Sequence, residues 1–408
     1  MNNKTSFLKF FPLLLIIAID SMGLGIIFPL LSSMIMDPNS TFLPLDASDF
    51  YRDILYGLII GIYMLAWFFG AAILGDISDI IGRRRSLLIC LIGACIGYFL
   101  SGLSLVCHSI TLLIIGRVVA GFTAGSQPIA QAAIVDMSEP EHKAKNIGLI
   151  LLSTSIGFIL GPLFGGVMSN NHLVSWFDFD TPMYFAMVLS ILNAVFLLLF
   201  FKETFTKTRK VKIRPHLAIE IFLASLKHPK IYNLSVILLV FISGWSEYFS
   251  FIAQFLLKTY HYSTMQTSFF ITVLAGGFGI GTGVFLDYCA NRFNLKLCIT
   301  IAAAISAIIA LVSAAIHSDI LVWICALCIG VSVAIAYALL ITLFSNQVDS
   351  TEQGWVMGVT NSIMALSFGI TTFFSGFALH YSPAMPIFLA FGGMMLAAII
   401  LKFTKIEN

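Results

Sequence analysis

Long hydrophobic runs separated by short polar stretches make up most of the chain. A helix that crosses a bilayer needs about 20 mostly apolar residues, and twelve runs meet this requirement. The sequence therefore predicts twelve membrane-spanning helices. We expect them at residues 10–36, 54–75, 86–107, 111–135, 146–169, 182–201, 231–257, 266–287, 297–316, 320–344, 354–379 and 384–403.

The composition agrees with this pattern. Of the 408 residues, 59% are hydrophobic and only 10% are charged, whereas a soluble domain has about 25% charged residues. A water-soluble enzyme is therefore excluded. The first run is also longer than the apolar part of a signal peptide, which has about 7–15 residues. We expect an all-α membrane protein whose first run remains as a spanning helix.

The distribution of basic residues predicts the orientation. An even number of spans places both termini on one side, together with nineteen Lys and Arg residues, while only Arg52 and Lys258 lie on the other side. Basic residues concentrate in cytoplasmic loops. The sequence thus predicts a multi-pass protein of the cytoplasmic (inner) membrane with both termini in the cytoplasm.

A hydrophilic stretch after the sixth span divides the chain. We expect an N-terminal six-helix bundle at 1–201, a cytoplasmic linker at 202–230 and a C-terminal six-helix bundle at 231–408. Residues 216–226 are mildly amphipathic, so they form either a helix on the membrane surface or a plain part of the linker.

The two halves resemble each other. Gly75 and Asp79 end the second span with the spacing G-x3-D, and Gly283 and Asp287 repeat it 208 residues later in the eighth span. Two six-helix pseudo-repeats are typical of secondary transporters, which bind substrate at the repeat interface.

Three charged residues lie well inside the spans: Asp20, Arg117 and Glu247. Each costs about 2.5–3.5 kcal/mol at the centre of a membrane helix, so they are expected to face the bundle interior or water. Asp20 either binds a proton or cation or forms a structural pair with a polar neighbour. Arg117 either shifts the pKa of a nearby carboxylate or holds backbone carbonyls.

Glu247 follows Trp245 and precedes Tyr248. We interpret Glu247 as part of a cavity, while the two aromatic residues are either a wall for a ligand or an interfacial belt. The seven Cys residues lie in or beside apolar runs, and Cys325 and Cys328 form a C-x2-C pair without a second pair or a nearby His. All seven are interpreted as small core residues rather than metal ligands or disulfides.

Three motifs resemble those of one transporter family. Gly75, Asp79, Gly82, Arg83 and Arg84 resemble motif A of the major facilitator superfamily, G-x3-D-(R/K)-x-G-x-(R/K)-(R/K), except that Ile80 replaces a basic residue whose charge Arg83 partly replaces. Here Gly75 would permit close packing, Gly82 a sharp turn, and the arginines would anchor the loop at lipid headgroups.

The fourth and fifth spans continue this resemblance. Arg117-x3-Gly121-x3-Gly125 resembles motif B, and Gly157, Gly161, Pro162 and Gly165 resemble motif C, g-x3-G-P-x2-G-G. Small residues at this spacing let a neighbouring helix approach closely. The loop that contains Asp136, Glu139, Pro140 and Lys145 is similar to that of drug and tetracycline exporters.

The resemblance implies a 12-helix drug:proton antiporter of this superfamily. Such a protein works by alternating access, with a cavity between spans one, four, seven and ten. It further implies that Asp79 faces the start of the eleventh span near Gly354, and that the motif A arginines reach Asp136.

We therefore expect a proton-coupled exporter of small organic molecules, drug-like or metabolite. The alternatives are a proton-coupled importer of a nutrient or siderophore-like metabolite, and a receptor or scaffold without transport. No catalytic set is recognisable, so no enzyme activity is expected. The expected partners are a small-molecule substrate, protons and membrane lipids, with no cofactor, metal or nucleic acid, and the chain is expected to be a monomer.

Overall fold

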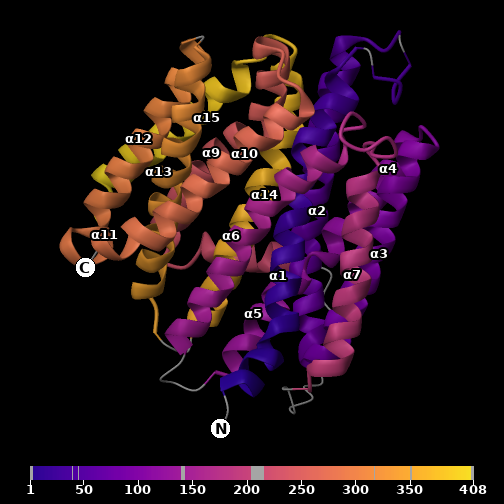
Figure 1. Cartoon of the computed structure of the whole chain (residues 1–408). Helices are drawn as coiled ribbons and strands as arrows, with labels where there is room; N and C mark the ends of the chain where they lie inside the picture. Colours follow the sequence, from indigo (N-terminus) through magenta and orange to yellow (C-terminus); the bar gives the residue numbers. More distant parts are fainter. Residues whose placement is uncertain are drawn as a thin grey trace. The chain divides into compact units, whose positions relative to one another are not determined.

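The computed structural model describes residues 3–38, 40–44, 46–138, 143–203, 216–316, 318–349 and 352–405, and all regular structure within them is helical. Figure 1 shows these helices along the chain. Glu139, Pro140 and the central part of the linker lie outside the described residues, as does the side chain of Lys145.

The first compact unit contains residues 1–45 and 62–218. Within it, α1 packs against α6, and α3 packs against α4 and α7. Figure 1 shows α6 beside α1. Its helices are α1 (Asn3–Leu31), the π-helical turn η1 (Ser32–Met36), the second part of α2 (Asp49–Ile81), α3 (Arg83–Val106), α4 (Ile110–Thr123), α5 (Ser126–Asp136), α6 (Lys143–Met168) and α7 (Thr181–Phe200).

The second compact unit contains residues 46–61 and 219–408. Here α9 packs against α14 and α15, and α12 packs against α13 and α15. The first part of α2 belongs to this unit. The other helices are α8 (Leu217–Ser225), α9 (Tyr232–Tyr260), α10 (Thr264–Ile280), the π-helical turn η3 (Gly281–Phe285), α11 (Leu286–Arg292), α12 (Leu295–Ala315), α13 (Asp319–Asn346), α14 (Gln353–Leu379) and α15 (Met385–Phe403).

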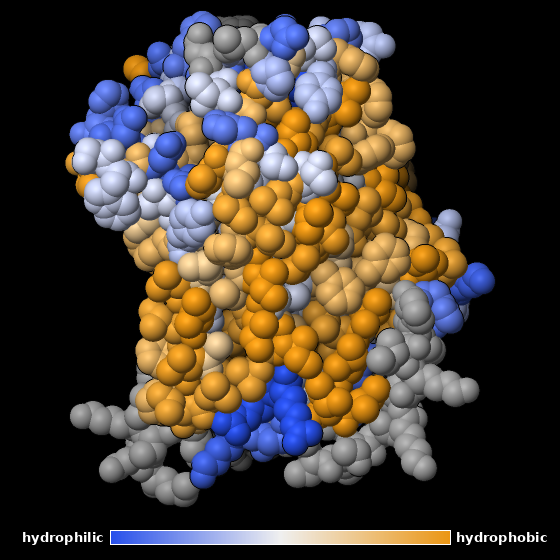
Figure 2. Space-filling view, turned by 90° about the vertical axis from the view of Figure 1, so that its right-hand side faces the viewer, coloured by the Kyte–Doolittle hydropathy of each residue, from blue (hydrophilic) through white to orange (hydrophobic). Residues whose placement is uncertain are grey.

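The twelve predicted spans are confirmed. Twelve segments of the described chain are long and apolar enough to cross a membrane, and their ends differ from the expected ones by only a few residues. Large apolar side chains are exposed on them, such as Ile92 (57%) and Leu199 (69%). Figure 2 shows hydrophobic residues over most of the face in view and hydrophilic residues gathered toward its two ends. Such a surface is suited to lipid rather than water.

Two expectations about smaller features are refined by the structure. Part of the amphipathic stretch forms the helix α8, in which Ala218 and Ser225 are buried while Leu223 is exposed. Of the seven cysteines, all free, only Cys90 and Cys325 are buried. The interpretation of all seven as core residues is therefore wrong. Since lipid is as apolar as a protein core, a hydrophobic run does not distinguish the two environments.

Candidate functional site in the membrane helices

Asp20 lies on α1 and is 8% exposed. Its carboxylate accepts a hydrogen bond from the hydroxyl of Ser126, the first residue of α5. The hydroxyl of Tyr98 occupies the space that Gly23 leaves one turn further along α1, because a Cβ on that glycine would collide with it. The carboxylate is therefore enclosed by side chains of the first unit and is held by a neutral donor.

Ser126 occupies this position because the fourth span is broken. The α4 helix ends at Thr123 and α5 begins at Ser126. Pro128 has no backbone N–H and its ring collides with the carbonyl of the residue four positions earlier, which is Ala124. The break therefore falls at Ala124 and Gly125, and it presents Ser126 at a new helix start. Broken helices are common around the binding sites of transporters.

Arg117 lies on α4 and is 1% exposed. Its guanidinium carbon lies 4.1 Å from the centre of the Tyr63 ring on α2, a cation–π contact. Tyr63 and Tyr98 both interact electrostatically with Arg117 and with Asp20. No ion pair joins Asp20 to Arg117, although both residues are described, and the two tyrosines lie near both of them.

The structure differs from one interpretation of Arg117. Within the described chain, this guanidinium makes no hydrogen bond to a backbone carbonyl, and its Nε is buried without a partner. The side chain is therefore held by an aromatic face and not by carbonyls.

Motif B packs α4 closely against α2, as the glycine spacing predicts. A Cβ at Gly121 would lie 2.3 Å from the backbone oxygen of Tyr63, and one at Gly125 would lie 2.7 Å from that of Gly70. Real Cβ atoms do not approach so closely. Glycine at these positions therefore lets Arg117 reach the face of Tyr63.

Motif C packs α6 against α1, the helix that carries Asp20. A Cβ at Gly157 would lie 2.3 Å from the oxygen of Ala18, one at Gly161 would lie 2.4 Å from the oxygen of Met22, and one at Gly165 would lie 3.1 Å from that of Ile26. Pro162 in turn fills the space beside Gly25. We call these contacts the α1–α6 seam. Because backbone meets backbone along it, α1 cannot shift along α6 without steric collisions.

Glu247 lies on α9 in the second unit and is 5% exposed. Its Oε1 accepts a hydrogen bond of 2.6 Å from the hydroxyl of Ser375 on α14, and its Oε2 is buried without a partner in the described chain. Tyr248 is fully buried and its hydroxyl lies 3.4 Å from that of Ser313 on α12. Tyr248 therefore packs inside the second unit, and its ring stacks with that of Trp245.

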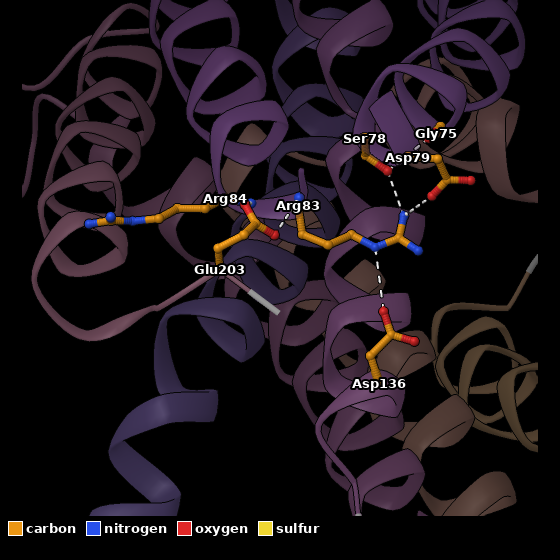
Figure 3. A network of polar contacts seen from close by, with 7 residues as sticks. All are labelled: Gly75, Ser78, Asp79, Arg83, Arg84, Asp136 and Glu203. Carbon is orange, nitrogen blue, oxygen red and sulfur yellow. Dashed lines mark hydrogen bonds and ion pairs between the residues drawn. The ribbon is translucent and has the colours of Figure 1, made fainter. Parts of the chain in front are cut away.

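The motif A residues form a polar network at the junction of α2 and α3 (Figure 3). Arg83 is the centre of this network. Its guanidinium lies 2.8 Å from Asp79 and 3.5 Å from Asp136, and it donates a hydrogen bond of 2.5 Å to Ser78. The expected contact between a motif A arginine and Asp136 is thus present, and Arg83 also pairs with Asp79. Arg83 supplies a charge beside Asp79 in place of the one missing at Ile80.

Glu203 completes the network from the end of the sixth span. Its carboxylate accepts hydrogen bonds from the backbone N–H groups of Arg83 (2.9 Å) and Arg84 (3.1 Å), the first two residues of α3. A carboxylate at a helix N-terminus is stabilised by these unpaired donors and by the helix dipole. Gly82 forms the turn with φ of 95°, and a Cβ there would collide with the Glu203 carboxylate.

One expectation about motif A is wrong and another stays a prediction. A Cβ at Gly75 would meet no described atom within 4 Å, so this glycine does not permit a close approach in this structure. Arg84 donates to the backbone oxygen of Leu198, and Arg83 is bound by carboxylates, while the anchoring of the loop at lipid headgroups stays a prediction. Only Arg85 of the three arginines is exposed. The other two arginines bind acceptors at the ends of neighbouring helices.

The sequence did not indicate several partners of the site. Ser126, Tyr63 and Ser375 are neutral, and such residues are common in membrane helices. Glu203 lies 120 residues from Arg83. A signal did exist for Ser126, since Gly125 and Pro128 on either side of it are strong predictors of a helix break.

Comparisons with known proteins identify the family. The family model of the Major Facilitator Superfamily matches residues 13–372. The chain belongs to this superfamily. The family inferred from motifs A, B and C is thus confirmed, and the chain is a multi-pass membrane transporter of small molecules.

The most similar relatives include resistance proteins. The chain is 25% identical to the quinolone resistance protein NorA of Staphylococcus aureus (strain COL), over 99% of this chain and 97% of NorA. It is 32% identical to the tetracycline resistance protein, class C, of Escherichia coli over 177 residues, which are 43% of this chain and 40% of that protein. The chain thus matches less than half the length of the tetracycline resistance proteins.

Solved structures show the fold. The human organic anion transporter MFSD10 superposes with a TM-score of 0.73 at 17% identity, covering 98% of this chain and 100% of that chain. A D-xylose-proton symporter superposes with a TM-score of 0.74 at 14% identity, covering 98% of both chains. The major facilitator fold of twelve helices in two six-helix repeats is therefore confirmed.

Proposed function

We propose that this transporter exports small organic molecules across the cytoplasmic membrane in exchange for protons, by alternating access. Both termini lie in the cytoplasm in this proposal. The six-helix bundles at 1–201 and 231–408 are its two moving halves, and the stretch at 202–230 links them. The chain works as a monomer surrounded by lipid.

The observation that carries the proposal is the setting of Asp20. A carboxylate is buried on α1, beside a break in the fourth span, and its one hydrogen-bond donor in the described chain is the neutral hydroxyl of Ser126. Intramembrane carboxylates are retained at ion and proton pathways despite their cost. Protonation removes the charge of Asp20 and changes the bonds it makes with α5.

The other site residues have separate roles in this proposal. Arg117 supplies a fixed positive charge in the first unit, held against the Tyr63 ring. Glu247 attracts cationic groups of a substrate in the second unit. Motif C makes α1 and α6 move together, so that protonation of Asp20 affects both helices.

Motif A supplies a latch at the cytoplasmic side. Asp79 meets the N-terminus of α14 in the outward-open state, where the free N–H groups of the first turn favour a carboxylate. Arg83 and Asp136 hold the α2–α3 junction in place for this contact. Because this contact forms in only one of the two states, it can shift the population between them.

Direction is supported by the relatives. NorA, a quinolone resistance protein, matches over nearly the whole chain. The alternative function, proton-coupled import, has support only from fold similarity to a D-xylose-proton symporter at 14% identity. A scaffold without transport leaves the cost of three buried charges unexplained.

Inside-out vesicles test the proposal. An acid interior is expected to drive uptake of a quinolone or a tetracycline into vesicles that contain the protein, and Asp20→Asn is expected to abolish the acid-driven part. A matched control is Asp287→Asn, which removes an acidic residue from the degraded copy of motif A. Substrate leaving the vesicles under an acid interior would instead establish an importer.

A further inference from the structure

Two of the seven cysteines lie close together at the junction of α11 and α12. Cys289 belongs to α11 and Cys298, nine residues later, to the first turn of α12. The sulfur of Cys298 lies 4.0 Å from the backbone oxygen of Cys289, within reach of a weak S–H hydrogen bond. The side chains of the two residues also interact with each other. We call these two residues the α11–α12 thiol pair.

A short connection between the helices brings this pair together. The α11 helix ends at Arg292, and the N–H of Phe293 donates a hydrogen bond of 3.3 Å to the same backbone oxygen of Cys289. Asn294 then caps α12, because its side chain accepts a hydrogen bond of 3.2 Å from the N–H of Leu297. The first turn of α12 therefore lies against the last turn of α11.

The α11–α12 thiol pair is open to solvent. Cys289 and Cys298 are both partly exposed, and residues 291–294 between them are all exposed. Asn291, Arg292 and Asn294 are polar, and such side chains are costly in the apolar part of a bilayer. The turn therefore lies at the aqueous edge of the membrane, where a small water-soluble oxidant reaches the pair.

The α11 helix is held by few contacts. It follows the π-helical turn η3, and none of its seven residues, all of which are described, is buried. A Cβ at Gly283 in η3 would meet no described atom within 4 Å. A segment with few buried contacts opens more readily than the rest of a protein. α11 can therefore move the short way from a thiol contact to an S–S bond of about 2.05 Å.

We propose that Cys289 and Cys298 form a redox-sensitive dithiol, which a peroxide oxidises to a reversible disulfide between α11 and α12. The site goes beyond the proposed function, because its chemistry needs neither transport nor proton coupling. In the orientation proposed above, this end of the eighth span faces the cytoplasm. Thiols are kept reduced there, and the disulfides that form are transient and often serve redox sensing.

The oxidation balances with hydrogen peroxide as the oxidant. The first sulfur, as a thiolate, attacks one peroxide oxygen; the O–O bond breaks, and a sulfenic acid and one water result. The second thiol attacks the sulfenic sulfur, so that the S–S bond forms and a second water leaves. The two thiols lose two electrons and two protons in total, and the peroxide becomes two waters. Exchange with an external dithiol restores both thiols.

The disulfide would fix α11 against α12. This segment carries Asp287, the last residue of the repeated G-x3-D spacing. A covalent bond to α12 removes the local opening that the few buried contacts of α11 otherwise permit. Oxidation is therefore expected to make α11 more rigid while the rest of the second unit stays as it is.

The test follows disulfide formation in the detergent-purified protein. Hydrogen peroxide is added at neutral pH, the remaining thiols are blocked at intervals, and mass spectrometry of unreduced fragments identifies the linked cysteines. We expect the disulfide between Cys289 and Cys298 to form and to disappear after addition of dithiothreitol. Cys289→Ser is expected to prevent it and to leave Cys298 as a sulfenic acid, which dimedone traps. Absence of this disulfide in the wild-type protein would overturn the inference.

The matched control is the C-x2-C pair of Cys325 and Cys328. These residues are closer in sequence, and their side chains also interact electrostatically. Both lie inside the spanning helix α13, and Cys325 is only 5% exposed. We expect this pair to oxidise about tenfold more slowly than Cys289 with Cys298, since access limits the reaction. Equal rates for the two pairs would overturn the inference, because closeness in sequence alone would then explain the disulfide.

Hydrogen–deuterium exchange tests whether the disulfide restrains α11. The backbone amides of Leu286–Arg292 are expected to exchange about tenfold more slowly in the oxidised wild-type protein than in the reduced one. The same peroxide treatment is expected to leave Cys289→Ser unchanged. Equal exchange in the oxidised and reduced wild-type protein would contradict the restraint.

These measurements are separate from those of the proposed function, because none of them uses transport. A protein that forms the disulfide but shows no acid-driven uptake in vesicles would refute only the proposed function. A protein with acid-driven uptake and no disulfide would refute only the α11–α12 thiol pair.

Discussion

Ser126 donates a hydrogen bond to the carboxylate of Asp20 across 106 positions of the chain. The bond joins α1 to the start of α5, where Pro128 interrupts the fourth span. Protonation of the carboxylate would therefore change a hydrogen bond at a point where the backbone already departs from regular helical geometry. The carboxylate of Asp20 thus contacts the start of a second helix of the first unit.

Asp20→Asn is expected to leave a folded, membrane-inserted protein that no longer couples substrate flux to a proton gradient. The amide keeps an oxygen that accepts the Ser126 bond but cannot take up a proton. Transport in vesicles with and without an acid interior measures the coupling. Uphill transport at the wild-type rate would show that Asp20 has only a structural role.

Glu247→Gln is expected to reduce transport of cationic substrates more than transport of neutral ones. A buried carboxylate attracts cations strongly in a medium of low dielectric constant, and the neutral amide does not. Competition between a cationic and a neutral substrate in one vesicle preparation measures the change. An equal loss for both would indicate a role in coupling instead of selection.

Asp79→Asn is expected to favour the inward-open state and to slow turnover, with cytoplasmic substrate affinity preserved. Loss of about 1–2 kcal/mol at the start of α14 would change the ratio of the two states about five- to thirty-fold. Spin labels on the cytoplasmic ends of α2 and α14 report this ratio as a change in their distance distribution.

Asp287→Asn is the control for this latch. Its surroundings lack most of motif A, since Ala290 replaces the glycine and Arg292 alone remains of the basic cluster. It is expected to change the distances less than Asp79→Asn does. Unchanged distances in Asp79→Asn, or an equal effect of the two variants, would contradict the latch.

Gly161→Val is expected to destabilise the protein by about 1–3 kcal/mol, a typical effect of overpacking. The new side chain would collide with the backbone of Met22 on the α1–α6 seam. Gly75→Ala is the control, since its Cβ would meet open space. Thermal unfolding in detergent compares the two, and equal stability of both variants would contradict the close packing of the seam.

Hydropathy predicted the spans well because a membrane helix must be apolar over its whole length, whether it faces lipid or protein. The same fact explains the error with the cysteines: Cys107 and Cys328 lie in or beside apolar runs yet are exposed. Asp20, Arg117 and Glu247 stood out because charge is rare in a membrane. The functional roles assigned to them stay predictions.

The contact partners of the charged side chains could be predicted less well than the charged side chains themselves. Arg83 and Asp136 were expected to meet because a known motif links them, whereas Glu203 has no such motif and reaches α3 only through the fold. Tyr63 and Ser375 likewise have no pattern of their own. Their position is decided by which face of α2 and α14 turns inward, and no amphipathic period indicates that face in a helix with lipid on its outer side.

The α1–α6 seam also limits how this transporter can acquire new substrates. The close packing of the seam depends on glycines, which have no side chain. Almost any substitution there would add volume where backbone already meets backbone. Selection for a different cargo would therefore act on side chains outside the seam. The seam would stay fixed while the chemistry around it diverges.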